Sequence, residues 1–576
     1  MTRQNGASPN DDRGCDLLIT GGLVVDGTGS PARRLDVRVR DGRIVELAAH
    51  LNAEGEPVVD AAGAYVAPGF IDSHTHFDAT VYWDPHLDPM ALHGVTSVVA
   101  GNCSLALAPM RAEARRPQID VYSYIEDLPA DMLEAVIPWN WESFGDYARA
   151  CAKLRLGVNL MTFVGHAQIR VFVMGEDAWR RTARAEEIAK MANELDRALC
   201  AGAVGMSFSL YDKDRAGRPV PSCLANDAEL DALMTVLSTH RASFQFVPAD
   251  TTEVIIEQLE WLGRFLARHR VTGLYNILVH LDSDPERSGR IVECLKRLRV
   301  KGAAIYGMVS PRPFELTLGF EQSIAFINVP AWNELVQADP ARQMKLLADP
   351  DWRERARTDA DTLPSVMFPF KRPDLLRFVS AGSETRLIGQ TLADLQAERG
   401  GHIADVLADF LAEQQLDVSF AFAIANTDRT VLAELLQSPV AFVSGSDAGA
   451  HLQMFCAAGD TTLLLTRYVR ERGDLSVEEA VAALTSRQAE VLGLGDRGRI
   501  APGMAGDFTI FELEELNYAE AHVVSDLPGG RPRLTRAPGG FRYTIVDGAI
   551  VQQDGTPTGA LPARWLPRSA AQTVSA

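Results

Sequence analysis

The middle of this chain alternates short apolar runs with stretches of helical pattern, and this rhythm restricts the fold more than any other feature. The helical stretches include residues 185–200, 228–239 and 477–492. Strands that are buried on both faces and alternate with helices form parallel βα units. The apolar runs that we interpret as strands cover residues 66–71, 97–100, 160–164, 204–208, 244–247, 275–279, 303–306, 418–424 and 440–443.

These runs predict an α/β protein with a TIM-like (β/α)8 barrel over residues 66–494. The barrel needs eight strands, so one of the nine runs must be a false strand or belong to an insertion. An open, doubly wound parallel sheet is the alternative that the same pattern leaves open.

Both ends of the chain are rich in strand signals. Asp41-Gly42 separates residues 35–40 from 43–47, and Asp547-Gly548 separates two further apolar runs. Asp-Gly between such runs is a strong hairpin signal. We expect one small β-sandwich domain built from residues 16–65 and 495–565. Residues 1–15 contain no apolar segment, so we expect a disordered leader there and no signal peptide.

Residues from about 308 to 416 interrupt the βα rhythm and are rich in proline and aromatic residues. A connection of this length is usually functional or has its own structure, so we predict an insertion over the barrel mouth. Its aromatic residues, together with Trp139 and Trp141, would suit an apolar acyl or aryl group of a substrate. Alternatively, they form core.

The charge balance excludes several classes of partner. With 56 basic and 76 acidic residues the formal net charge is −20, which argues against nucleic acid and anionic membrane surfaces. No segment has the roughly 18 consecutive apolar residues of a membrane span. Seven scattered cysteines without a CxxC pair indicate a reduced, cytoplasmic protein. We expect a small-molecule substrate, and a homo-oligomer is compatible with the sequence.

Potential metal ligands follow several of the predicted strands. His74 and His76 alternate along the end of the first strand and therefore point to the same side. Two imidazoles on one side suit zinc or a similar metal, and barrel enzymes keep their chemistry at the C-terminal ends of the strands. Each of the other candidates could alone be a cap or a core residue, but together they predict a metal centre: Cys103, His166, His280 and Asp447.

Five segments occur in a characteristic order: VAPGFIDSHTHFD, GNCSLALAP, VGHAQIRVFVMG, SGSDAGAH and DRGRIAPGMAGDFTIFE. They resemble motifs of the amidohydrolase superfamily and, more closely, of its D-aminoacylase (N-acyl-D-amino-acid deacylase) branch. The resemblance extends over about residues 16–565. It implies a (β/α)8 barrel with a β-sandwich from both termini, and a hydrolase that uses one or two zinc ions, although another divalent metal is compatible.

The resemblance also implies roles for individual residues. His74, His76 and Asp447 would be metal ligands, Cys103 would take the place of the branch's metal-binding cysteine, and Asp447 would also be the general base. The branch has two further histidines on the fifth and sixth strands. His280 fits the sixth, whereas the fifth reads SFQFVP over residues 243–248. A single metal ion is therefore favoured, with a second left open.

The reaction that we expect is metal-dependent deacylation of an N-acyl amino acid, with the D configuration suggested by the branch. His166 or His280 would stabilise the oxyanion, and Arg170 or Arg312 would bind a substrate carboxylate unless they are ordinary surface arginines. Two alternatives stay open. One is another C–N substrate, such as a cyclic amide, a carbamate or an aryl amide. The other is a non-catalytic scaffold, which the retained ligands disfavour.

Overall fold

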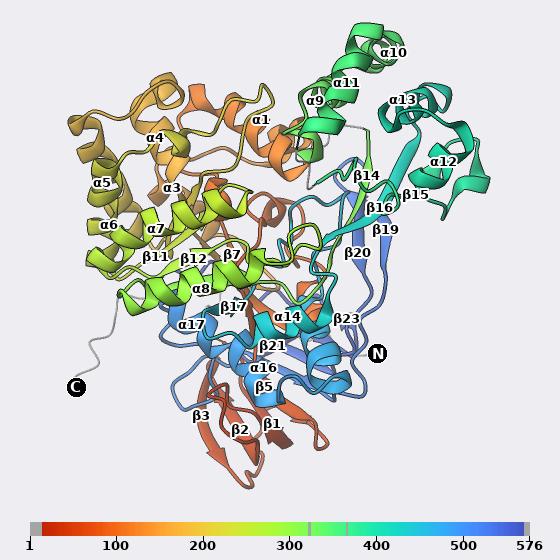
Figure 1. The fold of residues 1–576 in the computed structure, drawn as a ribbon. Helices are drawn as coiled ribbons and strands as arrows, with labels where there is room; N and C mark the ends of the chain where they lie inside the picture. The colour runs from red at the N-terminus through yellow and green to blue at the C-terminus, as the bar shows by residue number, and fades with distance from the viewer. Residues whose placement is uncertain (1–13, 321–323, 364–366, 569–576) are drawn as a thin grey trace.

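The computed structural model describes residues 14–320, 324–363 and 367–568, so nearly all of the expected leader at residues 1–15 lies outside the described residues. Two parallel sheets lie at the centre of the described chain (Figure 1). The first contains β6 (Phe70–Asp72), β7 (Val95–Ala100) and β8 (Asn159–Thr162). The second has the order β17 (Ala441–Val443), β13 (Ile305–Val309), β12 (Gly273–Tyr275), β11 (Ser243–Val247), β10 (Gly205–Ser209) and β9 (Val164–Gly165).

Each of these strands runs parallel to its neighbours, and strands such as β7 and β10 are buried along their whole length. This double-sided burial is why they are continuous apolar runs in the sequence. Only Phe163 separates β8 from β9, so one sheet leads directly into the other. At the opposite edges, a parallel bridge joins Thr75, after β6, to Ala448, after β17. The predicted α/β class is confirmed.

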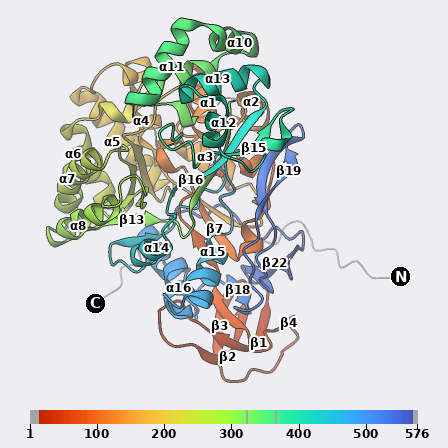
Figure 2. The ribbon, with the colours of Figure 1, turned by 45° about the vertical axis from the view of Figure 1, so that its right-hand side comes forward.

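Helices cover the parallel sheets. Their bounds are α1 (Arg115–Glu126), α2 (Ala130–Val136), α3 (Phe144–Cys151), α4 (His166–Met174), α5 (Ala185–Cys200), α6 (Asp227–His240), α7 (Thr252–His269), α8 (Arg287–Val300), α14 (Arg429–Leu436), α15 (Asp460–Leu463), α16 (Val477–Leu484) and α17 (Ser486–Leu492). Helices α4 to α8 lie together on one side in both ribbon views (Figures 1 and 2). The helix predicted over residues 185–200 is confirmed as α5, and a capping box of Ser476 and Glu479 begins α16.

The helix predicted over residues 477–492 is divided in the structure. Thr485 leaves the helical conformation, with φ −131° and ψ −86°. Its hydroxyl donates to the carbonyl oxygen of Val481 (2.6 Å), a local bond that competes with the continuing helix. Gln488 then donates to the carbonyl oxygen of Val443 (2.6 Å), which attaches α17 to the end of β17.

A mixed sheet combines strands from both ends of the described chain. It consists of β1 (Leu17–Val24), β2 (Arg33–Arg40), β3 (Arg43–Ala48), β4 (Val58–Asp60), β5 (Tyr65–Pro68), β18 (Phe508–Phe511), β21 (Tyr543–Val546), β22 (Ala549–Gln553) and β23 (Thr556–Pro557). The two predicted hairpin turns are present. Asp41, Gly42, Asp547 and Gly548 have positive φ values of 46°, 70°, 46° and 80°, as a tight two-residue turn of this kind requires.

The chain from β14 to β16, between β13 and β17, forms a group of elements whose helices lie at the end of the molecule opposite β1 to β3 (Figures 1 and 2). The elements are β14 (Phe314–Gly319), α9 (Pro330–Gln337), α10 (Pro340–Ala348), α11 (Pro350–Thr362), β15 (Arg377–Ala381), α12 (Leu392–Arg399), α13 (Ile403–Glu413) and β16 (Val418–Ala425). Strand β16 pairs antiparallel with β14 and β15. The run at 418–424 is therefore the surplus member of the nine predicted strands. The hairpin of β19 (Ala521–Leu527) and β20 (Arg531–Arg536) lies beside this insertion.

The aromatic residues of the insertion form its own core. Phe326, Trp332 and Phe368 are fully buried, and Phe326 packs on the other two rings with centroid distances of 6.2 and 5.0 Å. Trp139 and Trp141 are also buried and pack on each other (5.9 Å). Of the two interpretations of these aromatic residues, the core interpretation is therefore correct for these five.

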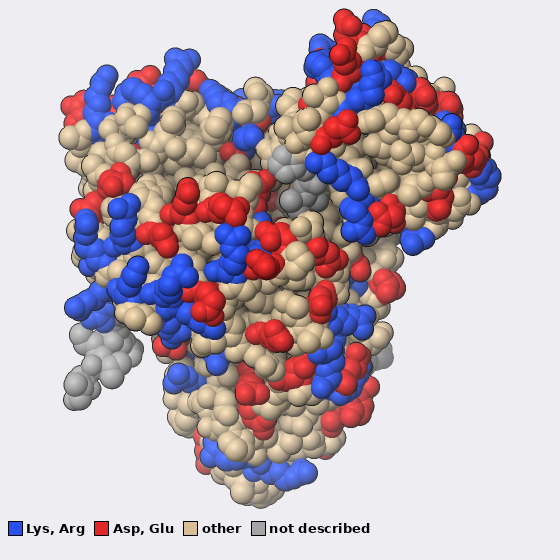
Figure 3. Space-filling view, viewed as in Figure 1, with Lys and Arg blue, Asp and Glu red and all other residues tan. Residues whose placement is uncertain are grey.

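Acidic and basic side chains are interspersed on the face shown in Figure 3. Many of them pair between neighbouring helices, as Arg268 does with Asp231 (2.8 Å) and Arg290 with Glu253 (2.9 Å). No helix in the described part of the chain is long and apolar enough to cross a membrane.

One buried ionic cluster connects the mixed sheet to the parallel strands. Arg497 lies 3.0 Å from Asp507 and 3.3 Å from Asp547, and all three side chains are 4–6% exposed. Asp507 precedes β18 and also accepts a hydrogen bond from Asn159 at the start of β8 (3.4 Å). The guanidinium of Arg497 therefore neutralises Asp507 where the two parts of the protein meet, and it shares Asp547 with Arg564, which lies 3.0 Å from that carboxylate.

Replacing Arg497 with methionine should destabilise the protein by about 3–5 kcal/mol, because it leaves the buried carboxylate of Asp507 without a counter-charge. Denaturant and thermal unfolding of the purified variant measure the change. The matched control is Arg499→Met at an exposed neighbouring arginine, with an expected change within about 0.5 kcal/mol. Equal stability of Arg497→Met and the wild type would contradict the role of the cluster.

Candidate metal centre

Three strand ends bring potential metal ligands together. His74 and His76 follow β6, and Asp447 follows β17 with a positive φ of 64°. Cys103 follows β7 in the short helix η3 (Asn102–Ser104), also with a positive φ, of 55°. The strands supply the direction of the side chains, and the turns after them bend the chain so that the side chains meet.

The donor atoms of these four residues converge. Sγ of Cys103 lies 3.3 Å from Nε2 of His74 and 3.9 Å from Nε2 of His76, and the donor atoms of all three lie within 4.8 Å of one another. Oδ1 of Asp447 lies 3.4 and 3.1 Å from the same two nitrogens. Zinc bonds of about 2.0–2.3 Å in a tetrahedron separate neighbouring ligand atoms by roughly 3.3–3.8 Å. The chemistry and the spacing of these donors therefore fit a zinc ion.

Residues around the cluster orient the ligands. Oε1 of Glu126, a fully buried residue at the end of α1, lies 3.0 Å from Nδ1 of His76. A carboxylate on the second ring nitrogen fixes the tautomer of a ligating histidine. Gln245 of β11 accepts a hydrogen bond from the backbone N–H of Cys103 (2.8 Å). Glu126 and Gln245 were not among the site residues predicted from the sequence. Gln245 lies in the predicted fifth strand, but Glu126 has no sequence signal.

Burial and the neighbouring side chains act in opposite directions on the pKa values of His74 and Asp447. Burial alone would lower the pKa of His74, but Cys103 and Asp447 outweigh it and raise that pKa to about 9. Burial likewise opposes charge on Asp447, yet hydrogen bonds from His74 and His76 hold the pKa of Asp447 well below its ordinary value. The carboxylate of Asp447 is therefore ionised at neutral pH.

The structure does not bring His280 into this cluster. Strand β12 ends at Tyr275, so the residue at the strand end is Asn276, whose amide lies 3.9 Å from Sγ of Cys103. His280 lies farther along the loop, where its ring faces Ser288 (3.5 Å) and Asp282 (3.8 Å). The apolar run at 275–279 had suggested a longer strand that ends next to His280, whereas β12 ends at Tyr275.

His166 and Arg170 are also turned away from the cluster. Both lie on α4 and are completely buried. The ring of His166 lies 2.8 Å from Glu229 and 2.9 Å from Oγ of Ser222, and Arg170 donates to the second oxygen of Glu229. Burial lowers the pKa of His166, although Glu229 acts in the opposite direction. His166, predicted to be catalytic, and Arg170, predicted to bind substrate, thus form a buried ionic cluster with Glu229.

Arg312, the other predicted carboxylate-binding residue, supports the loop of Asp447 instead. Its guanidinium donates to Asp460 (3.0 Å) and to the carbonyl oxygen of Ser446 (2.6 Å), and the residue is 3% exposed. Asp460 already neutralises Arg312, and the bond to Ser446 makes this arginine a structural support for the loop that carries Asp447.

Two adjoining cavities lie beside the cluster. The inner cavity, about 150 Å³, contains His76, Cys103 and Asp447 of the cluster in its wall. The outer cavity, about 230 Å³, shares with it Tyr211, Met367, Asp447 and His451. The remaining wall of the outer cavity is mainly apolar. The insertion supplies Phe314, Leu316, Ile327 and Ile424, and the loops after β12 and β17 supply Ile277, Val279, Leu281 and Phe455.

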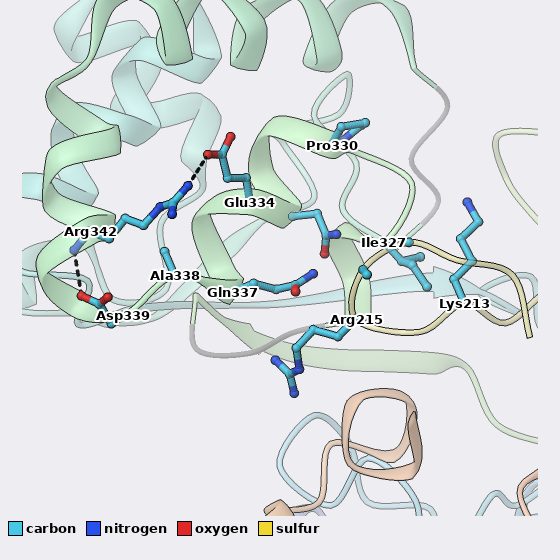
Figure 4. A pocket seen from close by; sticks show the side chains of 12 residues that line it. Lys213, Arg215, Ile327, Pro330, Glu334, Gln337, Ala338, Asp339 and Arg342 are labelled. Atoms are coloured by element: carbon cyan, nitrogen blue, oxygen red, sulfur yellow. Dashed lines mark hydrogen bonds and ion pairs between the residues drawn. The ribbon is translucent and has the colours of Figure 1, made fainter. Parts of the chain in front are cut away.

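A wider hollow of about 680 Å³ opens next to the outer cavity, and Ile327 lines both. Figure 4 shows it between the loop of Lys213 and Arg215 and the helix α9, where Glu334 pairs with Arg342 (3.0 Å). The potential ligands of the cluster do not line this hollow, so the chemistry belongs to the two smaller cavities.

A family model described as "Amidohydrolase family" matches residues 57–305 and 390–552, which is most of the chain. An uncharacterised protein of Mycobacterium tuberculosis is 32% identical over 94% of this chain and 92% of its own length. The D-aminoacylase of Alcaligenes xylosoxydans xylosoxydans is 27% identical over 98% of this chain and 100% of its own length.

Solved structures show the same fold. The N-acyl-D-glutamate deacylase of Bordetella bronchiseptica, crystallised with zinc and a phosphonate inhibitor that mimics the tetrahedral intermediate, superimposes with a TM-score of 0.66 at 24% identity. The match covers 96% of this chain and 100% of that one. The chain belongs to the amidohydrolase family, in the branch of hydrolases represented by D-aminoacylase.

Proposed function

We propose that this protein hydrolyses the amide bond of N-acyl amino acids in a zinc-dependent reaction, with the D enantiomer as the preferred substrate. The main support is the convergence of His74, His76 and Cys103 beside the carboxylate of Asp447, in the wall of a cavity. The D configuration rests on the similarity to D-aminoacylase. As part of this proposal, the two parallel sheets close into one (β/α)8 barrel, and the mixed sheet forms the small β domain.

We further infer a single zinc ion, held by His74, His76 and Cys103 with Asp447 beside them. The strands that would supply ligands for a second ion present Gln245, in the middle of β11, and Asn276, directly after β12. Neutral carboxamides are poor zinc ligands in comparison with imidazole, thiolate or carboxylate. Gln245 is moreover engaged by the backbone of Cys103, so it supports a ligand and does not replace one.

When bound, zinc supplies Lewis-acid activation of water and of the scissile carbonyl group. Asp447 then acts as the general base: its ionised carboxylate accepts a proton from the attacking water and passes it to the leaving nitrogen. His451 lies 4.0 Å from Asp447 and lines both cavities. We assign to His451 the oxyanion-stabilising role that the sequence had suggested for His166 or His280.

The direct test of the proposed function is turnover of N-acetyl-D- and N-acetyl-L-amino acids by the zinc-loaded protein, measured as release of free amine. We expect hydrolysis of the D series and loss of activity after zinc is chelated. Turnover of a cyclic amide, carbamate or aryl amide without turnover of either series would replace the proposed substrate. If the purified protein contains no zinc and shows no amidase activity after zinc is added, the non-catalytic scaffold is favoured.

Asp447→Asn should keep the fold and reduce kcat by at least about 100-fold, because the amide cannot accept the proton of the attacking water. Steady-state kinetics with the best N-acyl substrate measure the effect. Asp351→Asn, at an exposed carboxylate of α11, is the control. If kcat of the Asp447 variant stayed within a few-fold of the wild type, Asp447 would not be the general base.

Glu126→Gln should weaken zinc binding by about 10- to 100-fold, since the carboxylate that orients His76 is lost. Competition with a chromogenic chelator measures the zinc affinity independently of activity. The exposed residue Glu113 provides the control variant Glu113→Gln. Unchanged zinc affinity would mean that Glu126 has no part in holding the metal ligand.

A further inference from the structure

Arg287 is a buried arginine that lines the outer cavity. It is the first residue of α8 and is only 8% exposed. Of the described residues that line this cavity, it is the one lysine or arginine. The rest of the wall is mainly apolar, and its carboxylic residues are Asp250 and Asp447.

The guanidinium of Arg287 is poorly satisfied by the protein. One terminal nitrogen donates to the carbonyl oxygen of Asp250 (2.6 Å), whereas the buried Nε has no hydrogen-bond partner. No carboxylate in the described ranges forms an ion pair with it. A buried guanidinium that has lost its hydration is costly unless an anion neutralises it. The natural partner is an anion that enters the cavity.

The surroundings limit where an anionic group of the substrate can lie. The described wall of the inner cavity contains the carboxyl groups of Glu126, Asp212 and Asp447 and no lysine or arginine. Arg170 and Arg312, which the sequence had suggested, are already neutralised by Glu229 and Asp460. In the described residues around both cavities, Arg287 is thus the guanidinium that is left for an anion.

We propose that Arg287 binds the carboxylate of the substrate and so selects anionic amides over neutral ones. This inference rests on the proposed function and specifies its substrate. The carboxylate lies against Arg287 in a bidentate arrangement, an apolar group contacts residues such as Val279 and Phe314, and the amide bond reaches Asp447. Arg287 is then a residue that determines specificity.

A polar chain of contacts connects Arg287 to the wider hollow. Lys213 donates to Asn328 (2.8 Å), Asn328 donates to Asp250 (3.3 Å), and the carbonyl oxygen of Asp250 accepts from Arg287. Lys213 and Arg215 lie on the loop that borders the hollow (Figure 4). The wall of the hollow contains three basic residues, these two and Arg342, against the acidic Glu334 and Asp339. This local excess of positive charge favours the approach of an anion to a protein whose net charge is −20.

The test compares hydrolysis of N-acetyl-D-leucine with that of N-acetyl-D-leucinol, in which a hydroxymethyl group replaces the carboxylate. In Arg287→Met the ratio of the two kcat/KM values should fall by roughly 10- to 100-fold, the usual effect of losing a charged hydrogen-bonded pair. Arg287→Lys keeps a cation and should retain more of the preference. Arg290→Met, on an exposed arginine paired with Glu253, should leave the ratio unchanged.

A ratio that stays unchanged in Arg287→Met, or that falls equally in Arg290→Met, overturns the inference. Thermal unfolding of each variant verifies that it is folded, and Arg287→Lys decides the question if Arg287→Met does not fold. If the wild type hydrolyses neither compound, the proposed function fails, and calorimetric binding of N-acetyl-D-leucine to the zinc-loaded protein tests Arg287 alone. Binding that is weakened in Arg287→Met, and not in Arg290→Met, then supports the inference, whereas equal or undetectable binding overturns it.

Discussion

Two backbone hydrogen bonds determine whether the metal ligands meet. The N–H of Asp447 donates to the carbonyl oxygen of His74 (3.1 Å), and the N–H of His76 donates to that of Ala448 (2.7 Å). They extend parallel pairing beyond the ends of β6 and β17. Gly449 permits this approach, because a Cβ there would lie 2.8 Å from the carbonyl carbon of His76 and because its φ is +93°. The position of the ligands thus depends on the register of the first and last parallel strands.

Four buried arginines differ in whether a carboxylate of the described chain pairs with them. Arg170 with Glu229, Arg312 with Asp460, and Arg497 with Asp507 form ion pairs, which hold helices and loops in place. Removing one partner of such a pair leaves an uncompensated buried charge, so these residues are under structural constraint. Arg287 lacks a carboxylate partner in the described chain, and this difference separates the arginine we assign to binding from those that build the framework.

Much of the fold could be predicted because its signals are local. Apolar runs between helices predicted the parallel strands, Asp-Gly predicted two hairpins, and His74-Thr75-His76 at a strand end predicted two of the clustered side chains. The predictions that differ from the structure depend on contacts between residues far apart in the sequence. The end of β12 at Tyr275 depends on pairing with β11 and β13. The sequence had suggested His280 at this strand end, where the structure has Asn276. Likewise, the sequence does not show that the partners of Arg170 and Arg312 lie 59 and 148 positions away.

The central claim is that a single zinc ion lies among His74, His76 and Cys103, beside the carboxylate of Asp447. Anomalous scattering at the zinc absorption edge, from crystals of the zinc-loaded protein, counts the metal ions and identifies their ligands. The account predicts one anomalous peak per chain at this cluster, with Gln245 and Asn276 outside the coordination sphere. A second peak between Cys103 and the ends of β11 and β12, or a zinc ion coordinated by His280, would contradict it.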